Sequence, residues 1–194
     1  MRPLRILCLL LLLSVAPAAA ARAEADPAAL WQALAGGGHV ALMRHALAPG
    51  TGDPMRVVIG DCATQRNLDD VGRAQARATG DAFRAHGIDR AVVLTSQWCR
   101  CRETAALLDL GPPEDVPALN SFFADRSKGP AQLDAVRAFL ENLGTDAPPH
   151  VLVTHQVVVT GLTDVFPRSG EIVVLRLTDG DGPPFIVAGR IPAF

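Results

Sequence analysis

Residues 39–46 read HVALMRHA, an apolar strand that runs directly into two side chains able to do chemistry. The compact run from His39 to Met43 is typical of a buried strand, and Arg44 and His45 follow at its end. A strand that delivers a guanidinium and an imidazole at its carboxyl end is typical of an α/β enzyme, in which ligands bind beyond that end.

Two later apolar strands end in the same way. The run AVVLT (91–95) precedes Ser96 and, a few residues on, Arg100. The run VLVT (151–154) precedes His155. Both are short, apolar and rich in β-branched residues, as buried strands are. Three separate stretches of chain therefore present polar side chains just after a strand.

Helices are predicted between these strands. The predicted helices cover residues 28–35, 68–86 with Asn67 as N-cap, 96–108 with Ser96 as cap, and 130–143. Residues 46–66 are rich in Gly, Pro and Asp and indicate a long loop, 119–129 is irregular, and two closing strands cover 171–177 and 185–191.

The alternation of strands and helices predicts one α/β domain, a three-layer αβα sandwich with a mostly parallel central sheet. The 194 residues and 49% hydrophobic content suit a single core. Because the carboxyl ends of parallel strands share one sheet edge, we expect Arg44, His45, Arg100 and His155 to meet there.

These four side chains suit phosphoryl transfer. Arginine binds phosphate oxygens in a bidentate manner and stays charged. An imidazole can attack phosphorus and form a phosphoramidate, which divides hydrolysis into two easier steps. A second imidazole can donate to the phosphoryl oxygens as charge shifts in the transition state.

Four stretches in order resemble the motifs of the histidine phosphatase superfamily, whose fold is phosphoglycerate-mutase-like. LMRHA (42–46) resembles R-H-G, and QRNLDDVGRAQA (65–76) resembles R-P-L-T-x-x-G-x-x-Q-A. TSQWCRCRETA (95–105) is similar to S-x-x-x-R-A-x-x-T-A, and VLVTHQ (151–156) is similar to V-x-V-x-T/S-H-G. The resemblance spans about 39–177.

The resemblance implies a phosphomonoester hydrolase that needs no metal or other cofactor. It implies that His45 is the nucleophile, that Arg44 and Arg100 clamp the phosphate, and that His155 is the second imidazole. Arg66 matches a motif position near the pocket mouth and is a weaker candidate for phosphate binding.

Three departures from the family pattern concern the site. Ala46 and Gln156 replace the usual glycines after the two histidines, and Gln156 retains its backbone N–H toward the phosphate. The stretch LNSFFADRSKG (119–129) lacks the glutamate that serves many members as general acid. Asp125 is the nearest carboxylate, with Asp53 and Asp61 as alternatives. The departures leave a second hypothesis open, a phosphate-pocket binding protein of the same fold that has lost turnover.

The N-terminus predicts export. A short basic start precedes the apolar run 6–15, which is too short to span a bilayer, and small residues of the A-x-A type follow at 18–23. We predict a signal peptide over 1–23 and a mature domain over 24–194, periplasmic or secreted, with no stable membrane insertion after cleavage. An uncleaved anchor is the alternative.

Export gives meaning to Cys62, Cys99 and Cys101. Residues two apart on a helix face different ways, so we expect Cys62 to pair with either Cys99 or Cys101 in an oxidising compartment. Three free, buried cysteines are the alternative. A zinc site is not expected, because the C-x-C spacing is not the usual one.

The formal charge of −2 argues against an obligate nucleic-acid partner, which requires clustered Lys and Arg. The expected partner is a small-molecule phosphoester, of the cell envelope or of extracellular origin. The sequence selects neither the ester nor the oligomeric state.

Overall fold

The computed structural model describes residues 25–194, and the predicted signal peptide lies outside the described residues. Six strands form one mixed sheet in the order β3-β2-β4-β1-β5-β6. The strands are β1 (His39–Arg44), β2 (Val92–Thr95), β3 (Pro113–Asp115), β4 (His150–Thr154), β5 (Ile172–Leu177) and β6 (Phe185–Ile191). The pairs β3-β2, β2-β4 and β4-β1 are parallel, whereas β5 pairs antiparallel with both of its neighbours, β1 and β6.

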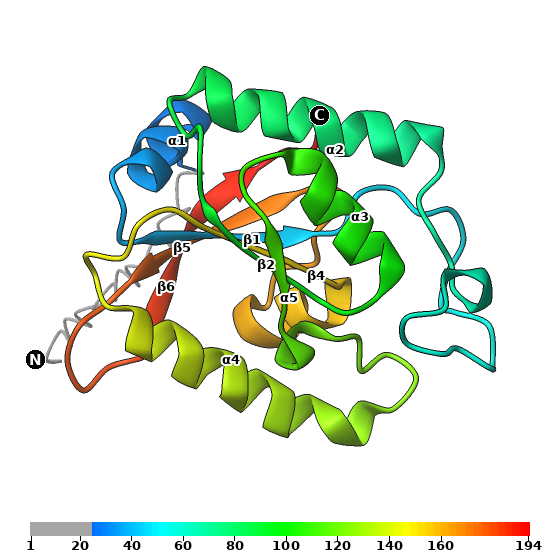
Figure 1. The fold of residues 1–194 in the computed structure, drawn as a ribbon. Helices are drawn as coiled ribbons and strands as arrows, with labels where there is room; N and C mark the ends of the chain where they lie inside the picture. Colours follow the sequence, from blue (N-terminus) through cyan, green and yellow to red (C-terminus); the bar gives the residue numbers. More distant parts are fainter. Residues whose placement is uncertain (1–24) are drawn as a thin grey trace, which may run out of the picture.

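Helices cover both faces of this sheet (Figure 1). The helices are α1 (Pro27–Ala35), α2 (Asp70–Ala85), α3 (Cys99–Leu108), α4 (Gly129–Leu143) and α5 (Gln156–Thr163). Helices α1, α2 and α3 pack on one face, and α4 and α5 pack on the other. The predicted three-layer αβα architecture is confirmed.

Strand β1 shows why the central strands are apolar throughout. Its successive side chains alternate between two cores: Ala41 and Met43 join the core beneath α1 to α3, and Val40 and Leu42 join the core beneath α4. All four are fully buried. A strand covered by helices on both faces needs apolar residues at every position, and this fixes β1 at the centre with His45 at its end.

Two predicted helix starts are corrected. Helix α2 begins at Asp70 because Asp69 accepts the Gly72 amide at 2.8 Å, whereas the Asn67 side chain bonds to the carbonyls of its own loop. Helix α3 begins at Cys99 and not next to Ser96, whose hydroxyl is engaged elsewhere.

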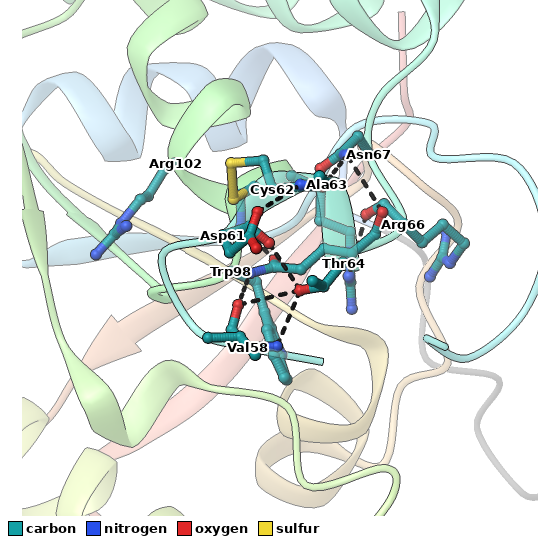
Figure 2. Close-up of a disulfide and its surroundings, with 12 residues drawn as sticks. Val58, Asp61, Cys62, Ala63, Thr64, Arg66, Asn67, Trp98 and Arg102 are labelled. Carbon is teal, nitrogen blue, oxygen red and sulfur yellow. Dashed lines mark hydrogen bonds between the residues drawn. A yellow bond between two sulfur atoms is a disulfide. The ribbon is translucent and has the colours of Figure 1, made fainter. Parts of the chain in front are cut away.

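A disulfide joins Cys62 to Cys99, with Cα atoms 5.7 Å apart, and ties the long loop to the start of α3 (Figure 2). Cys101 is the free cysteine among the described residues, and it is buried. The expectation of a bridge from Cys62 is confirmed, with Cys99 as its partner.

We expect the double variant Cys62→Ser, Cys99→Ser to lose about 4 kcal/mol of unfolding free energy, the chain-entropy value for a loop of this length. Urea unfolding at fixed pH measures the loss. Reductant should destabilise the wild-type protein by the same amount and leave the double variant unchanged. Three alkylatable thiols in the unreduced mature protein would contradict the bridge.

Candidate functional site

The backbone places both histidines side by side at the carboxyl edge of the sheet. His45 follows β1 and its amide donates to Thr154 O at 2.9 Å, so the ladder between β1 and β4 continues into the site. His155 follows β4 directly. The two imidazole centroids are 5.5 Å apart.

His45 is oriented by its own neighbour. Its Nδ1 lies 2.7 Å from the Ala46 carbonyl oxygen, which can only accept a hydrogen bond, so Nδ1 carries the hydrogen. The lone pair is therefore on Nε2, where Arg100 Nε approaches to 3.2 Å. An imidazole fixed in this tautomer presents a nucleophilic nitrogen toward the cationic side of the site.

His155 is held by a short polar chain. Its Nε2 lies 2.8 Å from Ser96 Oγ, and Ser96 in turn donates to Asn120 Oδ1 at 3.1 Å. With Nε2–H on Ser96, Nδ1 accepts from Arg100 Nη2 at 3.2 Å and faces the site. Sequence reasoning interpreted Ser96 as a helix cap and missed Asn120, because neither contact is local.

Burial keeps both imidazoles neutral. His45 and His155 are 2% and 3% exposed. Burial, and next the charge of Arg100, hold the pKa of each histidine well below its ordinary value. His45 is therefore unprotonated, as a nucleophile must be, at neutral and mildly acidic pH.

Three arginines surround the imidazoles and differ in their hydrogen-bond partners. Arg100 is buried and donates through Nη1 and Nη2 to the two carboxylate oxygens of Asp53, at 2.7 and 3.0 Å. Arg44 Nη1 donates to Pro167 O at 3.0 Å, and its buried Nε has no partner among residues 25–194. Arg66 donates to the carbonyls of Gly52 and Ala48 and so holds the loop.

One cavity of about 480 Å³ unites these groups. Its lining comprises Arg44, His45, Gly50, Thr51, Gly52, Asp53, Arg66, Arg100, Ser121, Phe123, Arg126, His155, Gln156, Val157 and Phe166. The candidates His45, His155, Arg44, Arg100, Arg66 and Gln156 are thus brought together. Asp53 is the carboxylate that the described lining contains.

Asp125 does not lie where a proton donor is needed. It is exposed, accepts from Ser127 Oγ at 2.6 Å and pairs with Lys128 at 3.5 Å. The Ser127 hydroxyl is the first cause that lowers the pKa of this carboxyl, the opposite of what a general acid requires. Asp61 caps a short 3₁₀ turn.

The two glycine replacements fit the backbone. Ala46 has no left-handed conformation, since Asp109 and Asp164 are the non-glycine residues with positive φ in the described chain. The Gln156 side chain donates to Thr160 Oγ1 at 2.8 Å and turns back along α5.

Acid should destabilise the fold through these buried histidines. Their folded pKa values lie below the unfolded value near 6.5, so the unfolded chain binds more protons as pH falls below that value. Stability is fully present above pH about 6.5 and is lost below it, by up to about 1.4 kcal/mol per pH unit for each histidine.

Denaturant titrations between about pH 7 and about pH 5 test this dependence, a window that lies above the ordinary carboxylate range. The variant His45→Asn should show a shallower pH slope than wild type, by about one proton. Equal slopes in the two proteins would contradict a depressed pKa at His45.

Across residues 25–194, no helix has the length and apolar character that a membrane span requires. The same residues hold no cluster of three or more His, Cys, Asp or Glu side chains suited to a metal ion.

Comparisons with known proteins agree with this fold. The sequence model of the histidine phosphatase superfamily (branch 1) matches residues 40–132. None of the curated protein sequences matches this chain.

Three solved structures show the shared fold. The protein histidine phosphatase SixA complexed with tungstate has a TM-score of 0.57 at 19% identity, over 79% of this chain and 96% of SixA. A mycobacterial hydrolase gives 0.59 at 14% identity, over 80% and 99% of the two chains. Mycobacterial glucosyl-3-phosphoglycerate phosphatase with VO3 gives 0.52 at 15%, over 76% and 95%.

Proposed function

We propose that this chain belongs to the histidine phosphatase superfamily, whose sequence model matches residues 40–132, and that it hydrolyses phosphomonoesters through a phosphohistidine on His45. One observation carries the proposal. A neutral imidazole with its Nε2 lone pair toward the site shares one cavity with a second imidazole and with Arg44 and Arg100. Four such groups at one sheet edge suit the transition state of phosphoryl transfer.

In the first step, His45 Nε2 attacks phosphorus in line, the bond from phosphorus to the ester oxygen breaks, and the alcohol leaves. Arg100 and Arg44 bind the equatorial oxygens, and His155 Nδ1 accepts from Arg100 Nη2 and so orients that guanidinium. In the second step, water attacks the phosphohistidine, phosphate leaves, and His45 returns to its neutral form. The two arginines supply the charge neutralisation, so we propose that no metal is needed.

The cavity has room for more than a phosphate ion. Phe123 and Phe166, both exposed, lie in its lining with the cation Arg126, whose guanidinium stacks 5.1 Å from the Phe123 ring. An alcohol moiety with a flat or apolar face fits these residues. The likeness to a glucosyl-3-phosphoglycerate phosphatase supports a phosphosugar or a similar small ester as the substrate class.

We propose a periplasmic or secreted location. The Cys62–Cys99 disulfide supports this, since structural disulfides persist in oxidising compartments. The location is tested by fractionating a culture and measuring the mass of the N-terminal peptide in each fraction. An uncleaved chain in the cytosolic fraction would contradict export.

Release of phosphate from p-nitrophenyl phosphate and a panel of phosphosugars, with and without EDTA, tests the activity. We expect turnover that EDTA leaves unchanged. Binding-only function is favoured by one observation, the occupation of Arg100 by Asp53. Phosphate binding without turnover of any ester would support the binding-only function and contradict the proposed phosphatase activity.

A further inference from the structure

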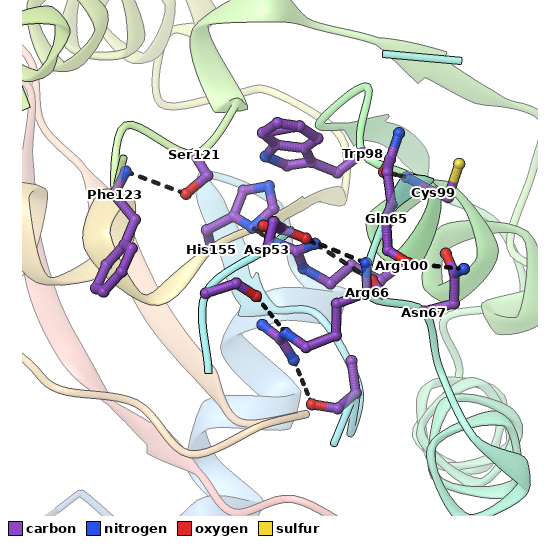
Figure 3. Close-up of polar contacts among 12 residues, drawn as sticks. Asp53, Gln65, Arg66, Asn67, Trp98, Cys99, Arg100, Ser121, Phe123 and His155 are labelled. Atoms are coloured by element: carbon purple, nitrogen blue, oxygen red, sulfur yellow. Dashed lines mark hydrogen bonds and ion pairs between the residues drawn. The ribbon is translucent and has the colours of Figure 1, made fainter. Parts of the chain in front are cut away.

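The site contains one carboxylate in an unexpected place. The Asp53 carboxylate makes a bidentate ion pair with Arg100 and is 15% exposed (Figure 3). The same guanidinium touches both imidazoles, His45 Nε2 through Nε and His155 Nδ1 through Nη2. Asp53 therefore lies one guanidinium away from the nucleophilic nitrogen, on the side that opens to the cavity.

A planar carboxylate and a phosphoryl group compete for this guanidinium. Both accept two parallel N–H bonds from one arginine, and Nη1 and Nη2 already serve Asp53. The phosphoryl group offers a third oxygen, which would also meet Arg44, whose buried Nε lacks a partner in the described chain. A bound ester must therefore displace the Asp53 carboxylate from Arg100.

The loop permits this displacement without unfolding. Arg66 holds the loop by donating to Gly52 O at 2.7 Å, next to Asp53. Gly50 and Gly52 adopt positive φ angles of 90° and 71°, which glycine adopts without strain. Asp53 Oδ1 also accepts from the Arg66 amide at 3.2 Å. We expect rotation of the Asp53 side chain within a fixed loop to give up this bond, move the carboxylate off Arg100 and keep it in the cavity wall.

Resting on the proposed phosphatase function, we propose that Asp53 is the catalytic residue that protonates the leaving oxygen, and that substrate binding releases it from Arg100 for this task. The ester arrives as a monoanion, and its proton passes to the Asp53 carboxylate, which has lost its cationic partner and faces a phosphoryl dianion.

The proton balance then closes over the two steps. When His45 attacks, the electron pair of the breaking P–O bond goes to the ester oxygen, which takes the proton from Asp53 and leaves as the alcohol. Asp53, again a carboxylate, accepts a proton from the water that attacks the phosphohistidine and passes it to the departing phosphate, which leaves as the monoanion. Release of phosphate returns Asp53 to Arg100. Asp53 thus occupies Arg100 when no substrate is bound, acts as general acid in the first step and acts as general base in the second.

A series of esters with increasingly basic leaving groups tests this role, because only a poor leaving group needs a proton. The esters are p-nitrophenyl, phenyl and alkyl phosphates. For Asp53→Asn we expect kcat/KM to fall by about 10²–10⁴-fold with the alkyl ester, the usual worth of general acid catalysis. With p-nitrophenyl phosphate the variant should change little, and orthophosphate should inhibit it more strongly because its competitor at Arg100 is gone.

Two matched variants complete the experiment. Asp125→Asn removes the rival carboxylate of the 119–129 loop, and Asp134→Asn removes an exposed carboxylate that pairs with Arg137 on α4. Neither should show a dependence on the leaving group. If Asp125→Asn shows the dependence instead, the acid is misassigned.

The outcomes separate this inference from the proposed function. If Asp53→Asn lowers kcat/KM by the same factor with every ester, Asp53 makes only a structural contact. If it raises kcat/KM with every ester, Asp53 only competes with the substrate for Arg100. Either result overturns the acid role while phosphatase activity stands. Absence of turnover in the wild-type enzyme with all esters would instead overturn the proposed function.

Discussion

His45→Asn should abolish phosphate release, lowering kcat by about 10⁴-fold or more, the scale seen when a covalent nucleophile is removed. The asparagine side chain is of similar size and keeps a polar group near the Ala46 carbonyl, but it offers no lone pair of imidazole basicity to phosphorus. Initial rates with p-nitrophenyl phosphate measure the loss.

The variant should still bind orthophosphate, because Arg100 and Arg44 remain, and calorimetric titration of wild type and variant serves as the control for an intact pocket. Turnover retained by a folded His45→Asn protein would show that some other group attacks phosphorus.

Arg100→Lys should lower kcat/KM by about 10²–10³-fold, the range found when one preorganised donor to a transition state is removed. Arg100 contacts His45 through Nε, His155 through Nη2, and Asp53 through Nη1 and Nη2, and a lysine ammonium cannot reproduce that fork. Steady-state kinetics with one activated ester is sufficient.

Arg102→Lys is the matched control on the same helix. Arg102 is partly exposed and pairs with Asp115 on the rim of the sheet, so its replacement should leave kcat/KM unchanged. Equal activities of the two lysine variants would remove Arg100 from the transition state.

The strands and the convergence of the site could be predicted because they follow from local pattern. The central residues of strands β1, β2 and β4 are apolar. His45 and His155 follow their strands directly, and Arg100 follows β2 five residues later, in the first turn of α3. Since neighbouring parallel strands end at one edge, His45, Arg100 and His155 had to come close. The cavity brings together the four residues singled out at those ends.

The remaining features depend on contacts between distant parts of the chain. Helix α5 is rich in β-branched residues, which give a weak helical signal, and its helicity rests on packing against α4 and the sheet. The support of His155 by Ser96 spans 59 residues and the ion pair of Asp53 with Arg100 spans 47, so neither has a local signature. The pairing of Cys62 with Cys99, and not with Cys101, depends on the orientation of α3, which turns Cys101 toward the core.

Rapid acid-free quenching of the enzyme during turnover, followed by mass spectrometry of its peptides, tests the covalent chemistry most directly. We expect a phosphoryl adduct on the peptide that contains His45, lost on mild acid treatment as a phosphoramidate is, and absent from His45→Asn. An active wild-type enzyme that carries no such adduct under single-turnover conditions, or carries it on another residue, would rule out attack by His45.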